Sequence, residues 1–462
     1  MKDLTQGSIL KHLVTMALPM TIGMCIQTLY VLTDLYFVGE LGGAAIAGLS
    51  LAGNIMFFIF ALSQIFNIGT ATTMAHAVGE KNQLIANRIF NQAVMSAVVA
   101  TFIVLSFGVF FSQWYLVNST PDIETIKAGL SYLYWFLPCM ALQFLMVTFG
   151  AALRSCGLVK PMMIAQASSL IINIILSPIL ITGIGTGFAM GIAGAGLASS
   201  ISVVVAVVYL WFYIAKKQQY ITLNLKQWLP DKAIILRIVN IGFPAGAEFL
   251  LMFVYMTVTY WAIQGFGPDA QAGFGLGSKI IQALFLPVMA LAFTLPAVAG
   301  QNYGAKKYKR VKSAFYWTVL LTIIFMLMVS LVSYFQPYLL VRYFSNEPEV
   351  IKQSTIFLQI VCFNYLATGF IFACSGFFQA IGNTWPAFFS TSTRLVSFVL
   401  PVVYMTENGG YSLADFWYLS VYAVIIQAVI SVFLLIIIWN RLGKKRGLVP
   451  INNNTVANSF EG

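Results

Sequence analysis

The chain has 462 residues, of which 60% are hydrophobic and only 8% are charged. A soluble domain carries about 25% charged residues, so no soluble fold could bury this much apolar surface. The net charge of +11 is spread over short loops and forms no single patch or stripe, which argues against a nucleic-acid partner. Composition therefore predicts an integral membrane protein that has the lipid bilayer as a partner.

Apolar runs of about twenty residues, the length that crosses a hydrocarbon core of about 30 Å, recur along the whole chain. In the first half they lie near 12-38, 45-74, 88-116, 128-151, 161-183 and 190-215. In the second half they lie near 233-264, 270-299, 313-337, 351-378, 385-406 and 415-440. The sequence therefore predicts an all-α integral membrane fold with twelve transmembrane helices.

Lysine and arginine are concentrated in alternate loops. The N-terminus, the even-numbered loops and the C-terminal tail hold twenty of them, whereas the other loops hold three: Lys127, Arg342 and Lys352. Positive residues are retained on the cytoplasmic side of a membrane. We therefore expect a multi-pass inner-membrane protein with both termini in the cytoplasm.

An internal repeat is visible at an offset of 225 residues. The matched residues are turn and kink formers: Pro19 and Pro244, Gly48 and Gly273, Gly79 and Gly304, Gly157 and Gly382, Pro161 and Pro386. Such residues report shared backbone geometry, because apolar composition alone would not align them. Each unit holds six spans, so the two lobes have the same orientation and are related by an axis along the membrane normal.

This repeat predicts the organisation of the chain. We expect an N-lobe over 1-217 with helices 1-6, a cytoplasmic linker over 218-232, a C-lobe over 233-441 with helices 7-12, and a cytoplasmic tail over 442-462. The two six-helix lobes are pseudo-symmetric, and a substrate site is expected in a central cleft between them. Gly187, Gly191, Ala195 and Ser199 follow one another at intervals of four and predict a close-packing stripe along helix 6.

Four ionisable side chains lie within predicted spans: Asp34, Glu248, Lys279 and Arg394. A charge at the centre of a membrane helix costs about 2.5 to 3.5 kcal/mol, so such residues face a partner or a cavity and tend to mark an ion or substrate path. Asp34 is the sharpest case, because its helix is otherwise apolar. Burial favours the protonated form of a carboxyl group, which allows a proton to load and leave. The alternative is an ordinary acid wetted at the outer membrane surface.

The second lobe holds the other three. Glu248 lies four residues after Pro244, and one interpretation is a charge-paired network with Lys279 and Arg394 that lines the cavity of this lobe. Lys279 could instead snorkel to the surface, since it lies about ten residues from its helix start. Arg394 is about 15 Å deep by helical rise and is expected to have a fixed partner.

Catalytic signatures are absent from the sequence. His12 and His76 are the only histidines, and no phosphate loop, nucleophile elbow or zinc signature occurs. A membrane-embedded enzyme would need clustered catalytic groups, and a channel would need repeated polar rings. We therefore expect a secondary transporter with no enzymatic activity, no cofactor and no metal site.

The sequence resembles the multidrug and toxic compound extrusion (MATE) family, in its DNA-damage-inducible-type bacterial branch, over nearly the whole chain. The resemblance rests on these stretches: Leu18-Pro19, Thr33-Asp34 through Gly39, the Gly79 loop, Arg154 to Gly157 through Pro161, Ala270 to Gly273, and Gly300 to Gly304. It implies export of amphipathic, often cationic, organic compounds from the bacterial inner (plasma) membrane. The exchange ion is a proton or sodium, and we expect a monomer.

The resemblance also implies roles for individual residues. Asp34 corresponds to the coupling acid of helix 1, whose titration is associated with bending at Pro19. Asn173, Ser177 and Ser199 correspond to the remaining N-lobe cation site. In the central cleft we expect five substrate-facing residues: Gln27, Tyr30, Glu248, Lys279 and Arg394.

The chain departs from the family pattern at Ser177, where many relatives carry an acid before the helix 5 proline. A hard cation prefers several charged or carbonyl oxygens, so the missing carboxylate favours proton coupling through Asp34. Two alternatives remain open. One is a sodium-coupled exporter, and the other is a lipid-linked precursor flippase of the same superfamily, which would favour a strongly cationic cavity.

Overall fold

The computed structural model describes residues 2–185, 187–217 and 220–444. Over this part of the chain it is helical and contains no β-strand, which confirms the all-α prediction. The first six helices are α1 (Ile9–Gly39), α2 (Gly43–Gly79), α3 (Gln83–Ser119), α4 (Ile123–Ser155), α5 (Lys160–Thr182) and α6 (Ile192–Lys217). Residues 218–219 of the predicted linker and 445–462 of the predicted tail lie outside the described residues.

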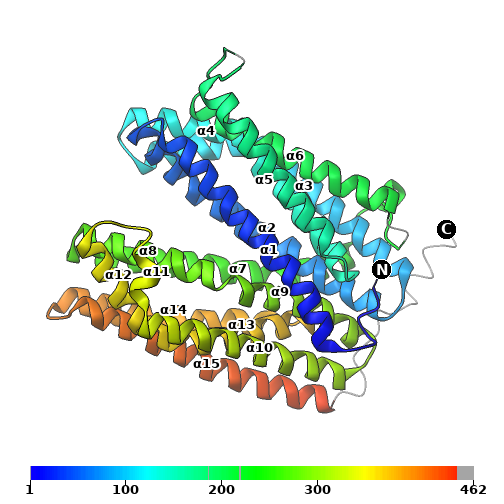
Figure 1. Ribbon diagram of the computed structural model, residues 1–462. Helices are drawn as coiled ribbons and strands as arrows, with labels where there is room; N and C mark the ends of the chain where they lie inside the picture. Colours follow the sequence, from blue (N-terminus) through cyan, green and yellow to red (C-terminus); the bar gives the residue numbers. More distant parts are fainter. Residues whose placement is uncertain (1, 186, 218–219, 445–462) are drawn as a thin grey trace.

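The remaining helices are α7 (Lys232–Ile263), α8 (Pro268–Leu284), α9 (Leu286–Gly304), α10 (Tyr308–Phe335), α11 (Pro337–Val341), α12 (Pro348–Val361), α13 (Tyr365–Ala380), α14 (Trp385–Asn408) and α15 (Leu413–Lys444). Figure 1 shows α1–α6, the first group, above α7–α15, the second group. The two groups meet at the right of this view and spread apart toward the left. We call the meeting side the closed end; α1 and α7 begin there, and α2, α4, α9 and α13 end there.

Eleven helical segments among the described residues are long and apolar enough to cross a membrane, and the bent pair α8 and α9 makes a twelfth span. The single run predicted over 270-299 is therefore corrected to two helices that meet at 46°. Pro287 lies in the first turn of α9. Proline has no N–H and clashes with the preceding turn, so it kinks or breaks a helix, and here the break lies directly before it.

The small-residue stripe predicted along helix 6 is also corrected. Gly187 and Gly191 have φ angles of 74° and 57° and precede α6, which begins at Ile192. The left-handed conformation favours glycine and belongs to a turn. Ala195 and Ser199 are the two members of the stripe that lie on the helix.

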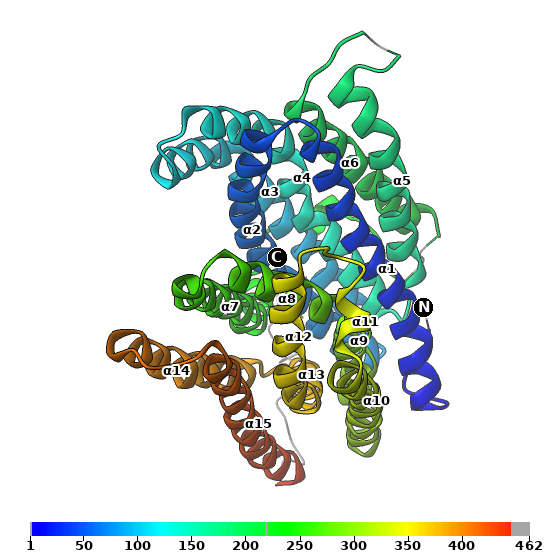
Figure 2. The ribbon, with the colours of Figure 1, turned by 60° about the vertical axis from the view of Figure 1, so that its left-hand side comes forward.

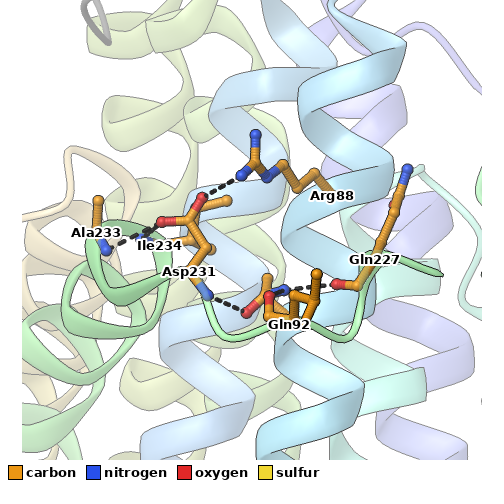
Figure 3. A network of polar contacts seen from close by, with 7 residues as sticks. Arg88, Gln92, Gln227, Asp231, Ala233 and Ile234 are labelled. Carbon is orange, nitrogen blue, oxygen red and sulfur yellow. Dashed lines mark hydrogen bonds and ion pairs between the residues drawn. The ribbon is translucent and has the colours of Figure 1, made fainter. Parts of the chain in front are cut away.

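The segment before α7 is tied to α3 of the first group. Gln92 on α3 donates from Nε2 to the carbonyls of Gln227 and Leu229 at 2.6 and 2.7 Å, and its Oε1 accepts from the Asp231 backbone N–H at 2.9 Å. Figure 3 shows Gln92 of α3 beside Gln227 and Asp231 of the segment before α7. These bonds fix the point at which the second group begins.

Asp231 joins this anchor to the start of α7. One carboxylate oxygen forms an ion pair with Arg88 at 3.0 Å, and the other accepts from the N–H groups of Ala233 and Ile234 at 3.0 and 3.3 Å (Figure 3). The second pair of bonds satisfies two N–H groups that the first turn of a helix leaves free. Asp231 is therefore both the N-cap of α7 and a link to the first group.

We predict that Asp231→Ala lowers the free energy of unfolding by about 1–2 kcal/mol, as the loss of an N-cap does. Asp231→Asn keeps an oxygen for the cap and loses only the partly exposed ion pair, so it should stay closer to the native protein. Thermal unfolding of the purified proteins in detergent measures their stability, which should fall in the order native protein, Asp231→Asn, Asp231→Ala. An Ala variant as stable as the native protein would contradict the capping role.

Candidate coupling site

Three helices of the first group turn polar side chains toward one another. On α1, Asp34 and Val38 are buried one turn apart. On α5, Asn173 and Ser177 are buried with the same spacing, and Ser199 is buried on α6. Residues four apart lie on one face of a helix, and Figure 2 shows α1 beside the pair α5 and α6, with which it makes contact.

The carboxylate of Asp34, which is 5% exposed, accepts a hydrogen bond at each oxygen. Asn173 Nδ2 donates to one oxygen at 3.1 Å, and Ser199 Oγ donates to the other at 3.0 Å. Asn173 Nδ2 also donates to Ser199 Oγ at 3.1 Å, which closes a triangle. This arrangement suits the ionised carboxylate, which only accepts. A proton on the oxygen that faces Asn173 would displace that donor, whereas the Ser199 hydroxyl can donate or accept.

Two further oxygens lie within one helical turn of this triangle. Ser177 Oγ and Asn173 Oδ1 are buried and have no hydrogen-bond partner among the described residues. Buried polar atoms are normally hydrogen-bonded, so such oxygens are available to a group that enters the site. The site thus contains spare acceptors but a single carboxylate.

The other residues that the sequence assigns to α1 are distributed along the helix. The Tyr30 hydroxyl lies close to Asp34, Asn173 and Ser199. Gln27 is exposed, two turns before Asp34. Pro19 lies inside α1, which continues through it to Gly39. The structure therefore brings Tyr30 to the Asp34 triangle and leaves Gln27 outside it.

Glu248 lies on α7 in a separate cluster of the second group. Its half-buried carboxylate accepts from Ser375 Oγ at 3.2 Å and from Thr391 Oγ1 at 3.1 Å. Gln379 donates to the Ser375 hydroxyl at 3.3 Å, and Gln427 donates to the Thr391 hydroxyl at 3.2 Å. This cluster joins α7 to α13, α14 and α15.

The charge-paired network considered for Glu248, Lys279 and Arg394 is not formed. The ion pairs of the described residues are Arg88 with Asp231 and Lys352 with Glu349. Hydroxyl groups of neighbouring helices occupy the oxygens of Glu248 instead.

The two basic residues have other surroundings. The Arg394 guanidinium lies 4.4 Å from the ring centre of Tyr255, where the negative face of the ring attracts it. Lys279 is exposed on α8. The fixed partner expected for Arg394 is therefore an aromatic ring.

The four side chains around Glu248 were not found by sequence reasoning. Ser375, Gln379, Thr391 and Gln427 resemble the many polar residues that join membrane helices. The internal repeat carries no signal for them, since the counterpart of Glu248 is a glycine, Gly23 (248 − 225 = 23).

Comparison with known protein families shows to which family the chain belongs. The MatE family model matches residues 19–179 and again residues 244–405. The chain belongs to the MatE family. The two matches begin 225 residues apart (244 − 19 = 225), which is the offset of the internal repeat. The resemblance to the MATE family seen in the sequence is thereby confirmed.

Two similar relatives are named as exporters. Multidrug export protein MepA of Staphylococcus saprophyticus is 27% identical over 442 residues, which cover 95% of this chain and 96% of that protein. MepA of Staphylococcus haemolyticus is 26% identical over 384 residues, which cover 82% of this chain and 83% of that protein.

Solved structures share the fold. An outward-facing multidrug resistance MATE transporter superimposes with a TM-score of 0.89 at 21% identity, covering 96% of this chain and 98% of that one. A Pyrococcus furiosus transporter, described as having a binding pocket of reversed polarity, gives 0.88 at 23% identity with the same coverage. These relatives and neighbours are transporters, in line with the prediction that the chain is not an enzyme.

We predict that Ser177→Asp creates a sodium site. A second carboxylate one turn from Asn173 would add the charged oxygens that a hard cation needs. A cation that binds the folded protein raises its stability. Sodium chloride should therefore raise the unfolding temperature of Ser177→Asp above that in choline chloride, and should leave the native protein unchanged.

Ser177→Asn is the matched control, because it has the size of the Asp variant without its charge. A sodium-dependent rise in the native protein, or in the Asn variant, would contradict the idea that the missing carboxylate limits sodium binding.

Proposed function

We propose that the protein is a secondary active multidrug exporter that exchanges amphipathic organic compounds, often cations, for protons. The observation that carries this proposal is the buried triangle of Asp34, Asn173 and Ser199. The family and the exporters named among its relatives support drug export. The triangle supplies a single group that can be charged in one state and neutral in the other.

Helix α1 is suited to couple this group to the rest of the molecule. It packs against α5 and α6 through the triangle and against α9 of the second group through its first half. Ala17 of α1 packs in one cluster with Ala290 and Leu291 of α9. When a proton reaches the Asp34 oxygen that faces Asn173, the donor bond from Asn173 is lost and α1 is released from α5. The same movement changes its packing on the second group.

Pro19 is the proposed hinge for this movement. Proline removes one hydrogen bond of the helix ladder, so α1 bends there at low energy. Solved neighbours described as MATE in a bent and in a straight conformation give TM-scores of 0.87 and 0.86 with this chain, at 21% and 20% identity. The fold is thus found in proteins described in two such conformations.

The transported compound is proposed to bind between the two lobes, 1-217 and 233-441, near Gln27 and Tyr30. The lobes would rock about the linker within the bacterial inner membrane, with both termini in the cytoplasm and a monomer as the working unit. Glu248, Lys279 and Arg394 are proposed to contribute to binding from the second lobe. Glu248 supplies negative charge for a cationic compound, although hydroxyl groups hold it in the present conformation.

Proton coupling is preferred to sodium coupling because the triangle has one carboxylate and Ser177 where a second acid would be needed. A lipid-linked precursor flippase would require a strongly cationic cavity. Of the two basic residues expected in the cleft, Arg394 lies against Tyr255. The single positive charge of Lys279 is not enough to bind a diphosphate by itself.

The test is uptake of a fluorescent organic cation into everted membrane vesicles under separately imposed proton and sodium gradients. We expect proton-driven uptake by the native protein and a loss of at least about tenfold in Asp34→Asn, which cannot titrate. Asp34→Glu keeps a titratable group and should retain part of the activity.

Three results would overturn the proposal. Uptake driven by sodium alone would mean that the oxygens around Ser177 suffice for that ion. Uptake that needs no gradient, or none with any cation tested, would favour the flippase alternative.

A further inference from the structure

At the closed end, His76 of α2 reaches across to the second group. Its Nε2 lies 2.7 Å from the carbonyl oxygen of Ala380 at the end of α13. A carbonyl only accepts, so Nε2 carries the hydrogen and donates. Nδ1 is then an acceptor, and Arg237 of α7 approaches it with Nη2 at 3.3 Å. The ring is buried and lies against Tyr303 of α9, with ring centres 5.0 Å apart.

Gln301 of α9 makes the reciprocal contact. Its Nε2 donates to the carbonyl oxygen of Ser155, the last residue of α4, at 2.6 Å. Its Oε1 accepts from the backbone N–H of Leu4 at 2.9 Å. Gln301 and Leu4 are both fully buried. The amide of Gln301 therefore has a partner on each side, and both partners belong to the part of the chain that contains the first group.

The internal repeat relates these two contacts. Gln301 is the counterpart of His76 (76 + 225 = 301), and Ala380 is the counterpart of Ser155 (155 + 225 = 380). Each group thus contributes one side chain, from α2 or from α9, that donates to the last carbonyl of a helix in the other group. The same side-chain-to-carbonyl bond is made twice, once in each direction.

Two glycines make these contacts possible. A Cβ at Gly79 would overlap the carbonyl of Gln301, and a Cβ at Gly304 would overlap the carbonyl of His76. These glycines are also counterparts at the offset of 225 (79 + 225 = 304). The backbones of α2 and α9 therefore touch where the donor side chains begin, and any larger residue would separate them.

We infer that His76 and Gln301 form a two-fold-related pair of latches that hold the closed end shut, and that both latches must open for the site to face that side. This inference rests on the proposed function, since only alternating access requires the closed end to open. His76 and Gln301 are positioning residues, because they contact neither the Asp34 triangle nor the Glu248 cluster. The bonds join side chains to carbonyls that the helix ends leave free, so breaking them exposes polar groups at the seam.

The experiment measures the distance between the two groups by pulsed EPR in the absence of any drug. Spin labels are placed at Lys160→Cys on α5 and Lys309→Cys on α10, both exposed at the closed end. The five native cysteines are replaced: Cys25, Cys139, Cys156, Cys362 and Cys374. His76→Phe keeps a ring and removes the donor, and Gln301→Leu removes both polar atoms of the amide.

The parent protein should show one dominant short distance. His76→Phe should raise the ratio of the long to the short distance about fivefold, as the loss of one hydrogen bond does. Gln301→Leu loses the bonds to Ser155 and Leu4 and should raise the ratio at least as much. The double variant should raise it further. Thr101→Val is the matched control, because Thr101 donates to the Ala141 carbonyl within the first group at 2.9 Å; its distances should equal those of the parent.

Gly79→Ala and Gly304→Ala test the same seam without removing a hydrogen bond. Each should also populate the long distance, because the added methyl group pushes the backbones apart. Unchanged distances in all four single variants would overturn the inference. If the variants shift these distances but the parent protein exports no drug, the latches stand and the export function is overturned. If the parent exports drug but the variants leave the distances unchanged, the export function stands and the latches are overturned.

Discussion

The Asp34 carboxylate must be kept inside a bundle of membrane helices, and the arrangement of the first group follows from that requirement. Its two oxygens are satisfied by Asn173 on α5 and Ser199 on α6, which ties α1 to both helices at one point. An uncompensated charge there would be strongly unfavourable. The bond from Asn173 that helps to make the charge tolerable is also the bond that a proton would break, so the proposed coupling uses the same contacts that stabilise the buried charge.

The duplication explains the seam between the groups but not the two acids. At the closed end His76 and Gln301 are exact counterparts and make reciprocal bonds. Within the spans, the counterpart of Asp34 is Thr259 (34 + 225 = 259), and Glu248 lies eleven residues earlier on α7. Eleven residues of helix correspond to about 16 Å. Shared geometry has been kept where the groups must close on each other, and the polar clusters have diverged.

Much of this arrangement could be predicted from the sequence. Hydrophobic runs gave the number of spans because lipid requires long apolar helices, and a lone acid in such a run pointed to Asp34. The partners Asn173 and Ser199 came from the family resemblance, since polar residues within membrane helices are too common to be chosen by type. Periodicity does not fix where a helix is interrupted, which is why the bend before Pro287 and the turn at Gly187 and Gly191 were missed.

The environment of Glu248 could not be predicted for a different reason. Its two partners and the residues that bond to them come from three helices far along the chain, and the relative rotation of these helices decides which side chains meet. The partner of Arg394 is a ring, Tyr255, and an aromatic residue carries no signal that distinguishes a cation contact from ordinary packing. How distant helices are rotated relative to one another is decided by packing of the core, and no local sequence pattern reports it.

The central claim is that a drug and a proton compete through Asp34, and proton release on drug binding tests it most directly. The purified protein is mixed with a saturating organic cation in weakly buffered detergent, and the pH change is recorded with an indicator dye. The account predicts proton release by the native protein and none by Asp34→Asn, with drug binding verified in both by fluorescence polarisation. Equal release by the two proteins would contradict it.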